Sequence, residues 1–79
     1  MDITISGQGI DVTPAIRSYV ENKLQKVPRI VPDVMDVHVK ISVQKHLQIV
    51  DLGVKTRHDT FSAHASTTDM YASINEGID

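Results

Sequence analysis

The clearest pattern in the chain is a strict alternation of apolar and polar residues between residues 35 and 43. The apolar positions are Met35, Val37, Val39, Ile41 and Val43, and every residue between them is polar. Successive side chains of a strand point to opposite faces, so this alternation predicts a strand with one buried face and one solvated face.

Shorter alternations predict three more strands. Residues 2–6 form the first of these, and residues 60–66 form the last, where Phe61 and two alanines alternate with polar residues. Between them, residues 47–54 predict a strand whose apolar phase shifts by one position after Ile49. A shift of one position is typical of a β-bulge, so we expect a bulge at this point.

Two other segments have apolar residues at helical spacing. The first is expected to begin with Thr13 at the N-cap and Pro14 at the first helical position, and Pro28 is expected to close it. The second is expected to begin after Thr68 or Asp69 as its N-cap. The two apolar stripes consist of Ile16, Val20, Leu24 and Val27, and of Met70 or Tyr71 with Ile74 and Ile78.

The resulting order is β-α-β-β-β-α, which predicts an α+β fold. Four strands and two helices make a two-layer sandwich in which both helices cover one face of the sheet, as in double-stranded-RNA-binding domains. The helical connection permits a parallel first pair of strands, and the short turns at residues 44–46 and 57–59 predict antiparallel hairpins. The other sheet face then presents polar side chains to solvent.

Composition narrows the range of functions. The chain has 79 residues, which is enough for one domain but too few for a deep, walled active site. It has no cysteine, so it can form neither a disulfide nor a thiol nucleophile, as suits a reducing cytoplasm. No apolar run approaches the roughly 20 residues that a membrane-spanning helix needs. We therefore expect no membrane association.

The net charge of −2 hides one basic segment. Residues 14–29 contain Arg17, Lys23, Lys26 and Arg29 against Glu21 alone. These side chains can form an ordinary solvated helix face, or they can form an edge that contacts phosphates. The charge pattern alone leaves both interpretations open.

The sequence offers little support for catalysis. His38 and His64 alternate outward on predicted strands, but their spacing matches no common metal motif, and surface histidines are the simpler interpretation. Asp59 fits a turn and Asp69 fits a helix cap, so neither is needed as a catalytic carboxylate. Phosphate-binding glycine loops and nucleophile motifs are also missing from the sequence. We expect no enzyme activity, no cofactor and no small-molecule substrate.

Three segments, taken in order, carry a family resemblance. They are Ile3-Thr4-Ile5-Ser6-Gly7, the run DVTPAIRSYV at residues 11–20 followed by Lys23, Leu24 and Lys26, and HAS at residues 64–66 leading into DMYASIN at residues 69–75. Together they resemble the ribosome hibernation promoting factor family, also called ribosome-associated inhibitor or sigma-54 modulation protein. The resemblance runs the whole length of the chain.

The resemblance implies a translation inhibitor that binds the small ribosomal subunit. Members of that family lodge where messenger RNA and the A- and P-site transfer RNAs would sit, and basic helix residues contact 16S ribosomal RNA. By position, Arg17, Lys23 and Lys26 match the basic residues of the family's first helix, whereas Arg29 falls at the helix end, where the family pattern varies. The family's second helix continues into a stretch rich in lysine and arginine. Residues 1–79 are therefore expected to be one ribosome-binding domain with a truncated second helix.

Two other hypotheses come from the polar sheet face. A protein-interaction module that modulates a transcription factor would use Lys40 and His38, and mutations of the helix charges would not affect it. A metal-dependent enzyme would use His38 and His64 as ligands.

Overall fold

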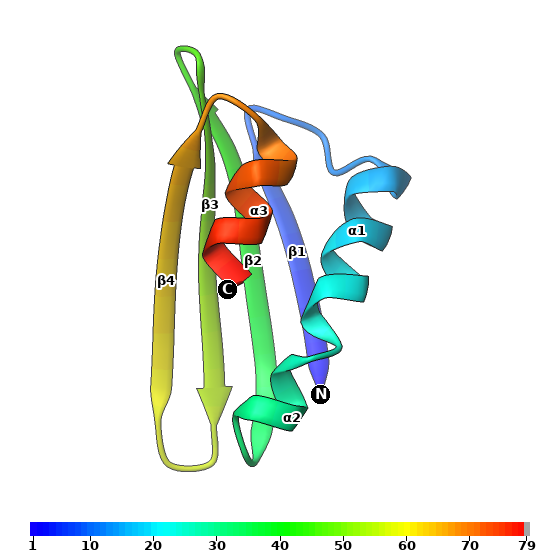
Figure 1. The fold of residues 1–79 in the computed structure, drawn as a ribbon, viewed down its shortest axis with the longest axis vertical. Coiled ribbons are helices and arrows are strands. Elements are labelled where there is room, and N and C mark those ends of the chain that lie inside the picture. The colour runs from blue at the N-terminus through cyan, green and yellow to red at the C-terminus, as the bar shows by residue number, and fades with distance from the viewer. Residues whose placement is uncertain (79) are drawn as a thin grey trace.

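The computed structural model describes residues 1–78, which form a four-stranded sheet with helices packed on one face (Figure 1). In chain order, the elements are β1 (Asp2–Gln8), α1 (Pro14–Leu24), α2 (Val27–Ile30), β2 (Val34–Gln44), β3 (Leu47–Thr56), β4 (Thr60–Thr67) and α3 (Met70–Ile78). The strands lie side by side in the order β1-β2-β3-β4. The first pair is parallel and the other two are antiparallel, which confirms the predicted α+β topology.

The core lies between the helices and the sheet. Alternate residues of β2 and β3 point toward the helices, and the apolar stripes of α1 and α3 close over them. The largest fully buried apolar side chains are Leu24, Ile41, Ile74, Val20, Val37, Val39 and Val50. The opposite sheet face has no helix over it in Figure 1. The two faces of the sheet therefore meet different surroundings, as the alternating pattern predicted.

Both predicted helix starts are confirmed by their caps. The backbone N–H of Ile16 donates to the Thr13 hydroxyl oxygen at 3.2 Å, and the N–H of Ala72 donates to the Asp69 carboxylate at 3.0 Å. Of the two candidates for the second cap, Asp69 is therefore the one used. Each bond satisfies one of the donors that a helix leaves unpaired at its start.

The first helix ends earlier than predicted. We expected Pro28 to close it, but α1 ends at Leu24, and Pro28 lies in the first turn of α2. The proline ring clashes with the carbonyl group four residues before it and supplies no N–H to that carbonyl. That carbonyl belongs to Leu24, so Pro28 ends α1 from a distance and starts α2, where the missing N–H has no cost. Val27 is still buried, but on a separate short helix.

The predicted bulge in the third strand is wrong. β2 and β3 pair without interruption from Asp36 to Gln44, and the one register shift falls between Val34 and Asp36. Ile49 is simply an apolar residue on the open sheet face, opposite Ser42. Because of the actual irregularity, Met35 is half exposed, and Val34 packs against the core in its place.

Candidate nucleic-acid interface

Lys23 lies on the flank of α1 that faces α3. One turn before it, Tyr19 contacts α3 in two ways: its hydroxyl donates to the Asn75 side-chain oxygen at 2.8 Å, and its ring meets that of Tyr71. The two tyrosine rings are perpendicular, with centroids 4.8 Å apart. The Lys23 ammonium group lies 5.6 Å from the Tyr19 ring centroid, within the range of a cation–π contact. This contact holds the ammonium group beside α3 without neutralising its charge.

Arg17 lies on the opposite flank of α1. At about 100° per residue, the directions of Arg17 and Tyr19 differ by about 160° around the helix axis. The Arg17 guanidinium Nη1 lies 3.9 Å from the Glu21 carboxylate, and both side chains are about half exposed. A surface pair of this kind contributes roughly 0.3–0.5 kcal/mol to stability, but it offsets the positive charge of this flank.

The remaining two basic residues lie beyond the end of α1. Lys26 lines an apolar hollow of about 320 Å³ together with Ile30, Phe61 and Ile78. It therefore lies on the same side as Lys23, toward α3 and β4. Arg29 is exposed on α2. The structure thus brings Lys23 and Lys26 to one side of the helix layer, whereas Arg17 lies on the other flank of α1 and Arg29 on a separate helix.

The rest of the helix layer adds little positive charge. Within Met70–Ile78, Glu76 is the sole charged residue, and Asp69 caps the helix. The basic character of this side therefore comes from α1 and the segment that follows it. We call the region formed by the partly exposed Tyr19, Lys23 and Lys26 and the exposed Tyr71 the lysine flank.

The open sheet face carries charges of both signs in alternating positions. Lys40, Asp51 and His64 are cross-strand neighbours on β2, β3 and β4, and the His64 Nδ1 atom lies 2.7 Å from an Asp51 carboxylate oxygen. Asp36 likewise pairs in register with Lys55. Lys40 with Asp51 and Asp36 with Lys55 join opposite charges, whereas Asp2 of β1 lies opposite Asp36, so the face offers no uniform positive potential to a polyanion.

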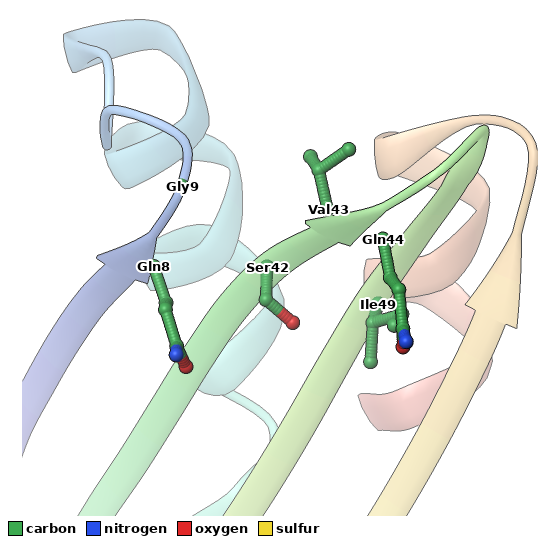
Figure 2. A pocket seen from close by; sticks show the side chains of 6 residues that line it. All are labelled: Gln8, Gly9, Ser42, Val43, Gln44 and Ile49. Atoms are coloured by element: carbon green, nitrogen blue, oxygen red, sulfur yellow. The ribbon is translucent and has the colours of Figure 1, made fainter.

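One end of this face is hollowed. Figure 2 shows Gln8, Ser42, Gln44 and Ile49 pointing to the same side of the sheet, and Val43 pointing to the other. The hollow they line has a volume of about 300 Å³ and contains no charged side chain in its lining. It lies on the opposite side of the sheet from the lysine flank, so the two surfaces cannot contact one ligand group together.

The two candidate metal ligands do not meet. His38 lies opposite Gly53 in the sheet register, whereas His64 lies on β4 and bonds to Asp51. Across residues 1–78, no group of three histidine, cysteine, aspartate or glutamate side chains could hold a metal ion. The same part of the chain has no helix with the length and apolar character needed to cross a membrane.

The contacts between Tyr19, Tyr71 and Asn75 were not predicted from the sequence. Asn75 is 56 positions from Tyr19, and no local pattern joins them. One signal was present: Tyr19 and Lys23 are four residues apart, the spacing at which side chains meet on a helix surface. The sequence could therefore have placed the ammonium group over the ring, but not the ring against the second helix.

The chain is similar to known proteins over nearly its whole length. A family model described as "Sigma 54 modulation protein / S30EA ribosomal protein" matches residues 3–79. Similar sequences include a ribosome hibernation promoting factor of Klebsiella oxytoca, 32% identical over 100% of this chain and 83% of that protein. One from Azotobacter vinelandii is 35% identical over 95% of this chain and 70% of that protein.

Solved structures agree with this match. A ribosomal subunit interface protein from Coxiella burnetii has a TM-score of 0.89 at 34% identity, covering 99% of this chain and 86% of that one. The N-terminal domain of Thermus thermophilus Protein Y has a TM-score of 0.90 at 27% identity, covering 100% of this chain and 89% of that one. Sequence and fold therefore indicate the same relatives.

Proposed function

Because this chain belongs to the Sigma 54 modulation protein / S30EA ribosomal protein family of ribosome hibernation factors, we propose that it binds the small ribosomal subunit and blocks translation by occupying it. The family is non-enzymatic. Within this proposal, the bound protein fills the region of messenger RNA and of the A- and P-site transfer RNAs, and it contacts 16S ribosomal RNA. Within this proposal, the protein acts in the cytoplasm, where ribosomes translate.

The observation that carries this proposal is the lysine flank. Lys23 is held over the Tyr19 ring with its charge intact, and Lys26 lies on the same side. A lysine ammonium group is a mobile point charge that suits phosphate oxygens at varied positions. Arg17 and Arg29 are further candidate contacts. We rank Arg17 below Lys23, because Glu21 offsets its charge. The flank suits the backbone of a structured RNA, which proteins recognise largely by shape and phosphate position.

Co-sedimentation with purified small subunits at several salt concentrations tests the proposal. We expect the protein to sediment with the subunits at low salt and to dissociate as salt rises, because phosphate contacts release counterions. Lys23→Ala and Lys26→Ala should each reduce the slope of log affinity against log salt by roughly 0.7–0.9 for every phosphate that the variant no longer neutralises.

Lys40→Ala is the matched control, since it removes an exposed lysine from the opposite face of the sheet. It should leave both the affinity and the slope unchanged. A protein that stays at the top of the gradient at low salt would contradict ribosome binding altogether. A slope that Lys23→Ala does not alter would contradict the assigned phosphate contact.

The open sheet face supports a second candidate function, binding of a protein that modulates transcription. The face is uncovered, and it combines exposed charges with a hollow lined by Gln8, Ser42 and Gln44. In this case, His38→Ala and Lys40→Ala would weaken the interaction, and Lys23→Ala would not. Parallel binding assays of these three variants against small subunits separate the two functions.

A further inference from the structure

Tyr71 is an exposed aromatic side chain at the edge of the lysine flank. The residue is 39% exposed, although it is the second residue of a helix that otherwise packs on the sheet. Tyr19 is more buried, its hydroxyl is bonded to Asn75, and the Lys23 ammonium group lies over its ring. The two tyrosines therefore differ in role: Tyr19 fixes the helices to each other, and Tyr71 presents ring surface to solvent.

The geometry of the pair leaves at least one ring face of Tyr71 uncovered by Tyr19. The interplanar angle is 89°, so the edge of one ring meets the face of the other. If the edge of Tyr71 points at Tyr19, neither face of Tyr71 is covered by it. If the edge of Tyr19 instead points at a face of Tyr71, Tyr19 covers that face and leaves the other face of Tyr71 uncovered. In both cases at least one face of Tyr71 is not covered by Tyr19, and the residue is 39% exposed.

The position of the Tyr71 ring is set before any ligand arrives. Asp69 is the N-cap of α3, and the buried side chains of Met70 and Ile74 hold α3 on the sheet. Tyr19, itself held by Asn75, supports the ring from the side. A ring held in this way loses little freedom when it stacks with a partner, so more of the stacking energy is available for binding.

We propose that Tyr71 is a stacking site for an unpaired RNA base, and that phosphates next to that base contact Lys23. This inference rests on the proposed function: it adds a contact to a base to the phosphate contacts already proposed. The two distances from the Tyr19 ring place the Lys23 ammonium group within roughly 10 Å of the Tyr71 ring centre, a span that one or two nucleotides cover. Proteins that bind single-stranded RNA combine these same two elements, an aromatic platform and an adjacent positive charge.

The neighbours of Tyr71 favour a nucleotide over an apolar peptide. An apolar peptide segment needs a groove lined by apolar side chains, which is what surrounds the other exposed aromatic residue, Phe61: Leu52, Val54 and Ile78 line the hollow next to it. Tyr71 instead contacts the ring of Tyr19, which lies under the Lys23 ammonium group and is bonded to Asn75. A flat ring with a positive charge within roughly 10 Å matches the chemistry of a base attached to a phosphate.

Tyrosine fluorescence gives a direct test, because the chain has two tyrosines and no tryptophan. Each variant keeps one tyrosine as its fluorophore. In Tyr19→Phe this is Tyr71. In Tyr71→Phe it is Tyr19. Both are titrated with a short oligoadenylate and with an abasic strand of equal length, which carries the same phosphates. The bases absorb some of the light, and the signal lost by Tyr71→Phe measures this absorption. We expect the oligoadenylate to quench the fluorescence of Tyr19→Phe by more than this amount. The abasic strand should quench neither variant. Equal signals from the two variants would overturn the proposal.

Affinity for small subunits gives the second test. Tyr71→Phe keeps the ring, and it breaks no internal hydrogen bond among residues 1–78, so it should bind within about twofold of the unmodified protein. Tyr71→Leu keeps an apolar contact with Tyr19 but has no ring, and it should bind about 5- to 150-fold more weakly with an unchanged salt slope. Phe61→Leu is the matched control for removal of an exposed ring elsewhere, and it should bind normally.

The outcomes separate the two proposals. Equal binding by Tyr71→Leu and Tyr71→Phe, together with a reduced salt slope in Lys23→Ala, would overturn base stacking and leave ribosome binding intact. If the unmodified protein does not sediment with subunits, the proposed function fails, and specific quenching by the oligoadenylate would still support stacking by Tyr71. Thermal unfolding of each variant confirms that weaker binding does not come from an unfolded chain.

Discussion

The hydrogen bond from the Tyr19 hydroxyl to Asn75 should make a measurable contribution to stability. Tyr19→Phe removes the donor and leaves the ring, with its contacts to Tyr71 and Lys23, in place. Both residues are partly exposed, so water can replace the missing partner, and a cost of about 0.5–1.5 kcal/mol is expected. A chain of 79 residues has a total stability of roughly 4–12 kcal/mol, so this one bond is a substantial share.

A double-mutant cycle isolates the bond from side effects. Asn75→Ala lies within α3, where alanine is a better helix former by up to about 0.7 kcal/mol, and this gain offsets part of the loss. The same gain is present when Asn75→Ala is made in the Tyr19→Phe background, so it cancels in the coupling energy. We expect a coupling of about 1 kcal/mol between the two substitutions.

Urea unfolding followed by far-ultraviolet circular dichroism is the assay. The single variants should lower the midpoint without changing the slope m, because the folded state keeps its compactness. Each kcal/mol of stability removed at the transition corresponds to a fall in Tm of about 4–8 °C for a domain of this size. The reasoning is refuted if the losses in unfolding free energy are additive. That is the case when the losses of the two single variants sum to the loss of the double variant within about 0.3–0.5 kcal/mol. The bond would then not join the helices in solution.

Two further predictions concern packing. Ile74→Ala removes a side chain with 0% exposure from the contact between α3 and the sheet. It should lower the free energy of unfolding, measured by urea titration, by about 2–5 kcal/mol. A loss below about 1 kcal/mol would place Ile74 outside the core. Ile30→Gln changes a residue that is 70% exposed on α2 and should alter the free energy of unfolding by no more than about 0.5 kcal/mol, and a larger loss in the same titration would show that Ile30 is covered in solution.

The strands and helix starts could be predicted because local patterns determine them. The alternation in residues 35–43 reports directly on the two faces of β2, and a cap such as Thr13 acts on an N–H three residues away. Both signals lie within a few positions of the structure they specify. The topology followed from the lengths of the connections, since a short turn can join only antiparallel neighbours.

The two errors arose where a local signal had more than one structural solution. Pro28 could end a helix at its own position or at the carbonyl four residues earlier, and the structure shows the second. The apolar Ile49 could mark a bulge or lie on the open face, and the uninterrupted pairing with β2 shows the latter. Only the contacts of the folded sheet decide between such alternatives.

The arrangement of the site depended on tertiary packing. The helical spacing placed Arg17 and Lys23 on opposite borders of the apolar stripe, but it could not say which border faces α3. The contact of Tyr19 with Asn75, 56 positions away, settles that question and puts Lys23 on the inner side. The sequence therefore identified the basic residues, and the fold divided them into a lysine flank and an arginine balanced by Glu21.

The separation of charges between the two faces explains how a chain with a net charge of −2 can suit a polyanion. Asp36 and Asp51 lie on the open sheet face beside cross-strand lysines, on the far side of the sheet from Lys23. The shortest dimension of the molecule is 18 Å, and at physiological salt charges more than about 8 Å apart are largely screened. An approaching RNA therefore meets the local charge of the lysine flank rather than the net charge of the chain. At about 0.01 M salt the screening length rises to about 30 Å, which exceeds the thickness of the molecule, and the RNA then meets the net charge of −2, which opposes binding. The gain in affinity on lowering salt should consequently level off at the lowest concentrations. A linear rise that continues through them would show that the RNA meets only the local charge of the lysine flank, even at low salt.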